Sequence, residues 1–166
     1  ADNPQKGRFR QFTQCDIDIL GDETNLAEIE LIGATAGMLT QIFATVGIDA
    51  FTVHVNDRKI LTAICLQAGF KEEDVASVLI SLDKFDKIGI EGVEAELIEK
   101  GFDLNCVAKL IKASSEIKSR GLAEAEKYGV AVDDINELTY IINTANSVIT
   151  NGKCVFDLSI VRGQGY

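Results

Sequence analysis

A helical pattern of apolar residues dominates the middle of the sequence, from about Arg58 to Thr150. Apolar residues recur there at spacings of three and four, as on the buried face of an α-helix. Two stripes show this most clearly: Val75, Val78, Leu79, Leu82 and Phe85, and then Ile135, Leu138, Ile141, Ile142 and Ile149. Glycines divide the pattern and predict helix ends at Gly69, Gly89, Gly101, Gly121 and Gly129. The chain is therefore predicted to contain a long succession of helices.

Strand-like segments lie on both sides of this helical stretch. Residues 7–20, 51–55 and 154–163 alternate in polarity, which predicts β-strands. Acidic and capping residues at 22–25 precede a predicted helix at 26–46. A strand at each end, with a helical region between them, indicates an insertion into a sheet-based core.

We therefore expect a mixed α+β fold in which the two ends of the chain meet in one sheet. The predicted division is a core part at residues 1–57, a helical insertion domain at 58–152 and a return strand at 153–166.

The composition is that of a globular protein, with 46% hydrophobic and 25% charged residues. Charged residues interrupt the apolar runs before they reach membrane-spanning length. The basic residues near the N-terminus are not followed by the apolar segment of a signal peptide. We therefore expect a cytoplasmic protein without membrane contact.

The net charge of −10 argues against non-specific binding to nucleic acids, because such a surface repels phosphates. A nucleic-acid partner would need a local basic patch. The densest basic stretch after the N-terminus contains Lys109, Lys112, Lys118 and Arg120. A solvated helix face is the favoured interpretation of this stretch, and docking to an RNA backbone is the alternative.

No pattern of metal ligands or of nucleophilic catalysis is visible. The four cysteines are far apart and form no CxxC pair, so no metal site is expected and buried thiols are the favoured interpretation. His54 is the one histidine and has no candidate nucleophile nearby in sequence, which favours a structural role. Walker, HExxH, GxSxG and EF-hand motifs are absent from the sequence.

Polar groups recur along one face of the first predicted strand, where a core strand would be apolar. The face consists of Arg8, Arg10, Phe12, Gln14, Asp16 and Asp18. In one interpretation a ligand lies along the sheet: arginines meet phosphates, the aromatic ring stacks on a base, and Gln14 with Asp18 holds an amine-bearing group. In the other, the face is exposed and carries cross-strand ion pairs. Alternation alone slightly favours the exposed face.

The C-terminal "RGQGY" places Arg162 between an apolar strand and a glycine-rich turn. The guanidinium could bind an anion at a strand end. An ordinary strand terminus is the better interpretation of this segment in isolation.

The two ends together resemble histidyl-tRNA synthetase, a class II aminoacyl-tRNA synthetase. "NPQKGRFRQFTQCDIDILGD" closely resembles motif 2 of that family, and "FDLSIVRGQGY" is similar to the beginning of its histidine-specific motif. "VHVNDRKIL" and "LDKFDKIGIEGV" are similar to segments between them. The resemblance runs in the expected order across the whole chain, and motif 2 is its most specific part.

The resemblance implies part of an antiparallel-sheet catalytic core with a mainly helical insertion domain, and a reaction in two steps. The carboxylate of L-histidine attacks the α-phosphate of ATP, which is bound as its Mg²⁺ complex, and gives histidyl-adenylate and pyrophosphate. The histidyl group then moves to the 3′ end of tRNA(His). The intact parent protein is expected to be a homodimer.

Residue roles follow from matched positions in the family motifs. Arg8 and Phe12 match the residues that bind ATP, with the ring under the adenine. Gln14 and Asp18 match residues that bind histidine, and their face of the predicted strand suits one ligand crossing it.

The C-terminal motif gives further matches. Arg162 matches the family's arginine near the histidine carboxylate and the α-phosphate, where it would act in catalysis by neutralising developing charge. Tyr166 matches a tyrosine that lines the histidine pocket. Gln164 and Gly165 depart from the leucine and aspartate that the family usually has there.

Motif 1, the motif 2 arginine, motif 3 and the anticodon-binding domain of the family have no counterpart in the sequence. We therefore expect an internal fragment that does not aminoacylate tRNA by itself. Two alternatives stay open: a synthetase-like regulatory subunit of ATP phosphoribosyltransferase in histidine biosynthesis, and an RNA- or protein-docking module formed by the helical region.

Overall fold

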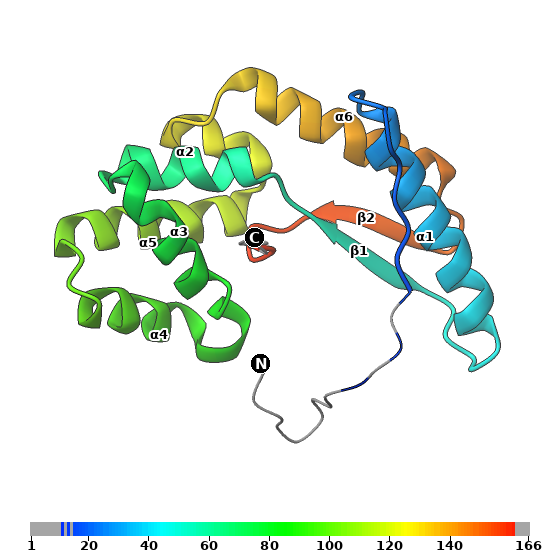
Figure 1. Cartoon of the computed structure of the whole chain (residues 1–166), viewed down its shortest axis with the longest axis horizontal. Coiled ribbons are helices and arrows are strands. Elements are labelled where there is room, and N and C mark those ends of the chain that lie inside the picture. The colour runs from blue at the N-terminus through cyan, green and yellow to red at the C-terminus, as the bar shows by residue number, and fades with distance from the viewer. Residues whose placement is uncertain (1–10, 12, 14, 162–166) are drawn as a thin grey trace.

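The computed structural model describes residues 11, 13 and 15–161, and shows a helix-rich mixed fold with one small sheet (Figure 1). Its helices are α1 (Leu26–Ala44), α2 (Arg58–Ala68), α3 (Glu72–Leu82), α4 (Phe85–Glu99), α5 (Leu104–Arg120), the 3₁₀ helix η1 (Leu122–Tyr128) and α6 (Val132–Val148). The strands are β1 (Phe51–Val55) and β2 (Gly152–Phe156). The α+β fold class is confirmed.

The two strands pair although about a hundred residues separate them in sequence. β1 and β2 run parallel, with Phe51 opposite Gly152 and Val55 opposite Phe156. Parallel neighbours need a long crossover connection, and the helical region supplies it. The helical region therefore does connect two paired strands, but the sheet joins β2 to β1 and does not include residues 15–20 of the predicted N-terminal strand. Of the antiparallel sheet that the resemblance implies, the described residues contain only this parallel pair.

The helices form two groups around the sheet. Figure 1 shows α1 and α6 beside the strands and α2 to α5 gathered on the other side of the molecule. α6 contacts α1, β2 and η1, so it joins the two groups. The domain boundaries at residues 57 and 152 stay a prediction.

The core lies among α2 to α6 and is built from the predicted apolar stripes. Its most deeply buried large side chains include Ile60, Ile64, Leu97, Leu110 and Ile117. The stripe of α3 is buried as predicted, and Phe85 packs against it half-buried. Burying such side chains removes apolar surface from water, which is the main favourable contribution to folding.

The predicted glycine boundaries are confirmed at four of five positions. Gly69, Gly101, Gly121 and Gly129 follow the ends of α2, α4, α5 and η1. Gly69 has φ +109°, a left-handed conformation that closes α2 and that other residues adopt only with strain. Gly89 instead lies inside α4 and kinks it, with φ 69° and ψ 177°. The helix resumes after the kink, so the glycine bends the element where a helix end was predicted.

Two parts of the predicted strands are wrong. Residues 15–20 form no strand and are mostly exposed, because no other described segment pairs with them and a strand needs a neighbour for its backbone groups. β2 ends at Phe156, since the Ile160 N–H bonds to the Asp157 carbonyl and turns the chain.

α1 is long and apolar enough, by length and composition, to cross a membrane, which differs from the expected absence of such a run. A helix packed on one face satisfies the same test. Ile29 and Ala36 of α1 are buried, and the helix contacts α6 and β2.

Candidate functional site

The predicted ligand-binding residues lie at the two ends of the chain. Five of them are outside the described residues: Arg8, Phe12, Gln14, Arg162 and Tyr166. Asp18 is described and lies exposed in irregular backbone, without the strand that was predicted to orient it. The described part of the site is therefore the segment that leads from β2 to Arg162.

This segment is a tight turn centred on Asp157. The Asp157 carboxylate accepts hydrogen bonds from the Ser159 backbone N–H at 2.9 Å and from its hydroxyl at 2.7 Å. The other carboxylate oxygen lies 2.8 Å from Nδ1 of His54 on the neighbouring strand. Burial raises the pKa of Asp157, but the hydrogen bonds from Ser159 and His54 outweigh it and leave the pKa below its ordinary value.

His54 thus has a fixed partner, which agrees with the predicted structural role. Nothing in the sequence pattern linked the two residues. They lie 103 positions apart, and the parallel register of β1 and β2 brings them together.

Asn56 follows β1 and holds the turn from the other side. Its Nδ2 donates to the carbonyl oxygens of Leu158 at 3.4 Å and Ile160 at 3.1 Å. Its Oδ1 accepts from the Asp57 backbone N–H at 2.9 Å. Asp57 in turn caps α2 by accepting from the Lys59 N–H at 2.8 Å. Sequence reasoning missed Asn56; its one signal was its place in "VHVNDRKIL".

Two buried apolar side chains anchor the same segment to the core. Leu158 and Val161 are 7% and 5% exposed and belong to the core cluster of the helical region. Residues 157–161 are therefore packed on the helices and hydrogen-bonded to Asn56 directly after β1.

The basic stretch on α5 divides into two pairs. Lys109 and Lys112 line an open pocket of about 260 Å³ together with Lys127. Lys118 lies over the ring of Phe85, with its Nζ 4.2 Å from the ring centre. Arg120 pairs with Glu124 at 3.4 Å. Of the four basic residues, Lys109 and Lys112 therefore lie at a pocket. Lys118 and Arg120 instead contact Phe85 and Glu124 of the same chain.

The same pocket has a polar wall. Tyr128 lines it and donates its hydroxyl to Glu116 at 2.5 Å, and this bond raises the pKa of Tyr128 to about 12. Lys127 pairs with Glu124. The pocket therefore presents ammonium groups beside a neutral phenol.

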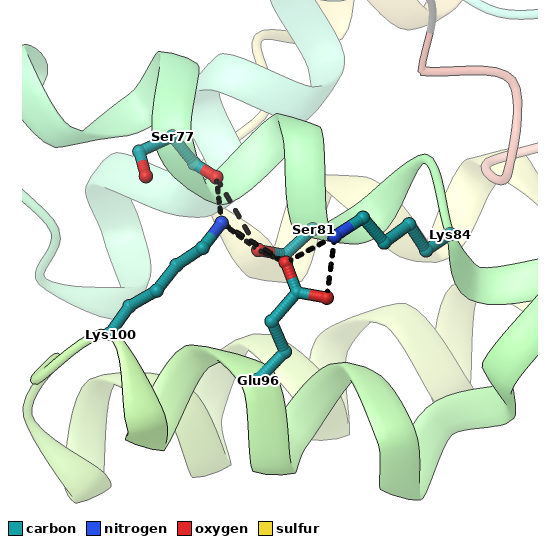
Figure 2. A network of polar contacts seen from close by, with 5 residues as sticks. All are labelled: Ser77, Ser81, Lys84, Glu96 and Lys100. Atoms are coloured by element: carbon teal, nitrogen blue, oxygen red, sulfur yellow. Dashed lines mark hydrogen bonds and ion pairs between the residues drawn. The ribbon is translucent and has the colours of Figure 1, made fainter. Parts of the chain in front are cut away.

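A second charged cluster joins α3 to α4, and Figure 2 shows its side chains converging on Glu96. Lys84 contacts both carboxylate oxygens of Glu96 at 2.8 Å, and Lys100 contacts one of them at 3.1 Å. The buried Ser81 hydroxyl donates to Glu96 at 3.0 Å. These bonds, first from Lys84 and then from Lys100, lower the pKa of Glu96 to about 2. The cluster was not predicted.

Among the described residues, no group of three or more His, Cys, Asp or Glu side chains could hold a metal ion. Cys65 and Cys154 are buried, as favoured for the cysteines, but Cys15 is exposed.

Comparison with known proteins gives the family. The family model described as "Histidyl-tRNA synthetase" matches residues 1–166. The histidine–tRNA ligase of Leifsonia xyli subsp. xyli is 40% identical over 175 residues, with 100% of this chain and 40% of that protein covered. The histidine–tRNA ligase of Phocaeicola vulgatus is 33% identical over 172 residues, with 100% and 37% covered.

A crystal structure of histidyl-tRNA synthetase from Nostoc sp. PCC 7120 has a similar fold. Its TM-score is 0.61 at 22% identity, and the match covers 81% of this chain and 34% of that one. The chain spans about two fifths of the length of the two curated relatives. The match of the family model over residues 1–166 places this chain in the histidyl-tRNA synthetase family.

Proposed function

We propose that this chain is part of a histidine–tRNA ligase, which activates L-histidine with ATP and transfers it to tRNA(His). The observation that carries the proposal is the family match over all 166 residues, which includes both motifs that bear the predicted ligand-binding residues. Residues 1–57 and 153–166 would belong to the catalytic core, and 58–152 would form the insertion domain. The intact enzyme would be a cytoplasmic homodimer.

In this proposal, the residues near the two ends share one reaction. Arg8 and Phe12 would bind the phosphates and adenine of ATP, and Gln14 with Asp18 would bind the substrate histidine. When the histidine carboxylate attacks the α-phosphate, negative charge develops there as pyrophosphate leaves. Arg162 would neutralise that charge, which is the electrostatic contribution such a transfer needs. Tyr166 would line the histidine pocket.

The test is histidine-dependent ATP–pyrophosphate exchange by the full-length protein that contains this chain. Arg162→Ala is expected to lower kcat by about 100- to 1000-fold, the loss typical for removing one group that stabilises transition-state charge. Asp18→Ala is expected to raise KM for histidine, because one group that binds the substrate is removed. Lys153→Ala and Asp49→Ala are matched controls, because both side chains are exposed and have no proposed ligand contact.

Wild-type protein that binds histidine without exchange would contradict the ligase and favour the regulatory subunit of ATP phosphoribosyltransferase. Exchange that survives Arg162→Ala would contradict the role of that arginine alone. Residues 1–166 by themselves are not expected to aminoacylate tRNA.

A further inference from the structure

The segment 157–161 is irregular but is held by several hydrogen bonds and by buried side chains. It lies between β2 and Arg162, and the Asp157 backbone N–H still donates to the Val55 carbonyl of β1 at 2.9 Å. It is also fixed by hydrogen bonds from His54 of β1 and from Asn56, which follows β1. The buried side chains of Leu158 and Val161 hold it to the core. These contacts fix residues 157–161, which immediately precede Arg162 in the chain.

Asn56 makes two of the side-chain hydrogen bonds that hold the segment before Arg162. It binds the carbonyl oxygen of Ile160, two residues before the arginine, and that of Leu158, four residues before it. A side-chain amide nitrogen has two protons, so one asparagine can hold two carbonyl groups at once. The amide oxygen is itself fixed by the Asp57 N–H at the start of α2. An aspartate at this place could accept that last bond but could donate neither of the first two.

The position of a catalytic group matters more than its mere presence. Misplacing a reacting group by about 1 Å can cost about 100-fold in rate. We therefore propose that Asn56 is a positioning residue, which orients Arg162 for adenylate formation by fixing the turn at 157–161. This inference rests on the proposed ligase function, and it adds a residue to which the resemblance gave no role.

The chain offers a matched control in a second asparagine clamp. Asn146 of α6 donates to the Cys154 carbonyl oxygen and accepts from the Cys154 N–H, both at 2.8 Å. It therefore holds the middle of β2 to a helix, eight residues before Arg162. Changing either asparagine to aspartate replaces one amide by one carboxylate and breaks bonds to β2 or its continuation. Only the change at Asn56 removes hydrogen bonds to residues 157–161.

The experiment compares Asn56→Asp and Asn146→Asp in the full-length protein. Asn56→Asp is expected to lower kcat for histidine-dependent ATP–pyrophosphate exchange by about 10- to 100-fold, with a smaller change in KM for ATP. Asn146→Asp is expected to retain kcat within about threefold although it also lowers the melting temperature, because it loses the 2.8 Å bond to the Cys154 carbonyl. Amide hydrogen exchange of residues 157–161 is expected to speed up in Asn56→Asp and not in Asn146→Asp.

Several outcomes would overturn the inference. Wild-type kcat in Asn56→Asp, together with an inactive Arg162→Ala, would remove Asn56 from catalysis and leave the ligase function intact. An equal loss of kcat in both aspartate variants would show a general structural effect. A wild type without histidine-dependent exchange would overturn the proposed function, and the role of Asn56 with it.

If Asn56→Asp is insoluble, Asn56→Ala tests the same point. It removes both donated bonds without adding a charge, so a similar loss of kcat is expected, and an unchanged kcat would contradict the inference.

Discussion

At the scale of single residues, Glu96 shows how the helical region uses charge. Its carboxylate receives bonds from two lysines and one buried serine (Figure 2). Ser81 lies in α3, Lys84 lies in the turn before α4, and Lys100 directly follows the end of α4. The two lysines approach the Glu96 carboxylate from opposite ends of α4, so neither lysine alone accounts for the ion pairing. Since α3 and α4 meet at this cluster, Glu96 links two helices whose junction is a short turn.

The pKa of Glu96 gives a pH-dependent prediction. A carboxyl group whose pKa falls from 4.5 to about 2 on folding stabilises the folded state above pH 4.5, and the contribution is lost as the pH falls towards 2. Glu96→Gln is therefore expected to be less stable than wild type at pH 6, with the difference shrinking between pH 4.5 and 2. Urea unfolding at several pH values measures this.

Glu99→Gln is the control, because Glu99 is exposed on the same helix and outside the cluster. A difference between wild type and Glu96→Gln that stays constant down to pH 2 would contradict the assigned pKa.

At the scale of elements, α5 shows how one helix combines a cap, an apolar stripe and a charged end. The Asp103 side chain accepts from the N–H groups of Asn105 at 2.9 Å and Cys106 at 3.1 Å. Val107, Leu110 and Ile117 follow at helical spacing and are almost fully buried. Lys118 and Arg120 stand in the last turn, where cations suit the helix dipole. Local sequence therefore determines both the existence and the ends of this helix.

Truncation of Leu110 tests the packing of α5. Its side chain is 1% exposed, so Leu110→Ala leaves a cavity and is expected to lower the free energy of unfolding by about 2–5 kcal/mol. Leu104→Ala, at the 64% exposed first residue of the same helix, is expected to change it by less than about 1 kcal/mol. Denaturant unfolding of the full-length protein measures both, and equal effects would contradict the burial of this stripe.

At the scale of the whole molecule, the helical region and the sheet are joined by shared packing. Leu158 and Val161 follow β2 and enter the core of the helices, while α6 spans the distance between that core and α1. Lys109 and Lys112, two of the four residues for which RNA docking is the alternative interpretation, lie beside a pocket of this helical region. Because the rest of the chain is acidic, binding of RNA there would be local and sensitive to salt.

A double charge reversal tests this surface. Lys109→Glu with Lys112→Glu is expected to weaken tRNA binding by the full-length protein and to reduce the dependence of log Kd on log salt by about one for each phosphate that the variant no longer binds. Lys71→Glu with Lys153→Glu is the control, because it changes the net charge equally at exposed sites outside the pocket. Unchanged affinity and salt dependence in the first variant would remove these lysines from the tRNA interface.

The sequence by itself determined the helical region, four of its five predicted glycine boundaries and the apolar faces that form the core. These features depend on residues within one or two turns of each other, so periodicity and capping are enough to predict them. The resemblance at the two ends also identified the family that the comparisons confirm. The roles of Arg8, Phe12, Gln14, Asp18, Arg162 and Tyr166 stay predictions.

Only the tertiary structure decided the parallel register of β1 and β2, the kink at Gly89 and the turn that ends β2. It also brought His54 to Asp157 and Asn56 to Ile160, residues that are 103 and 104 positions apart. A polar side chain carries no local signal of which distant carbonyl or carboxylate it will bind. Its partner is chosen by the packing of helices between the two strands, and that packing depends on the whole chain.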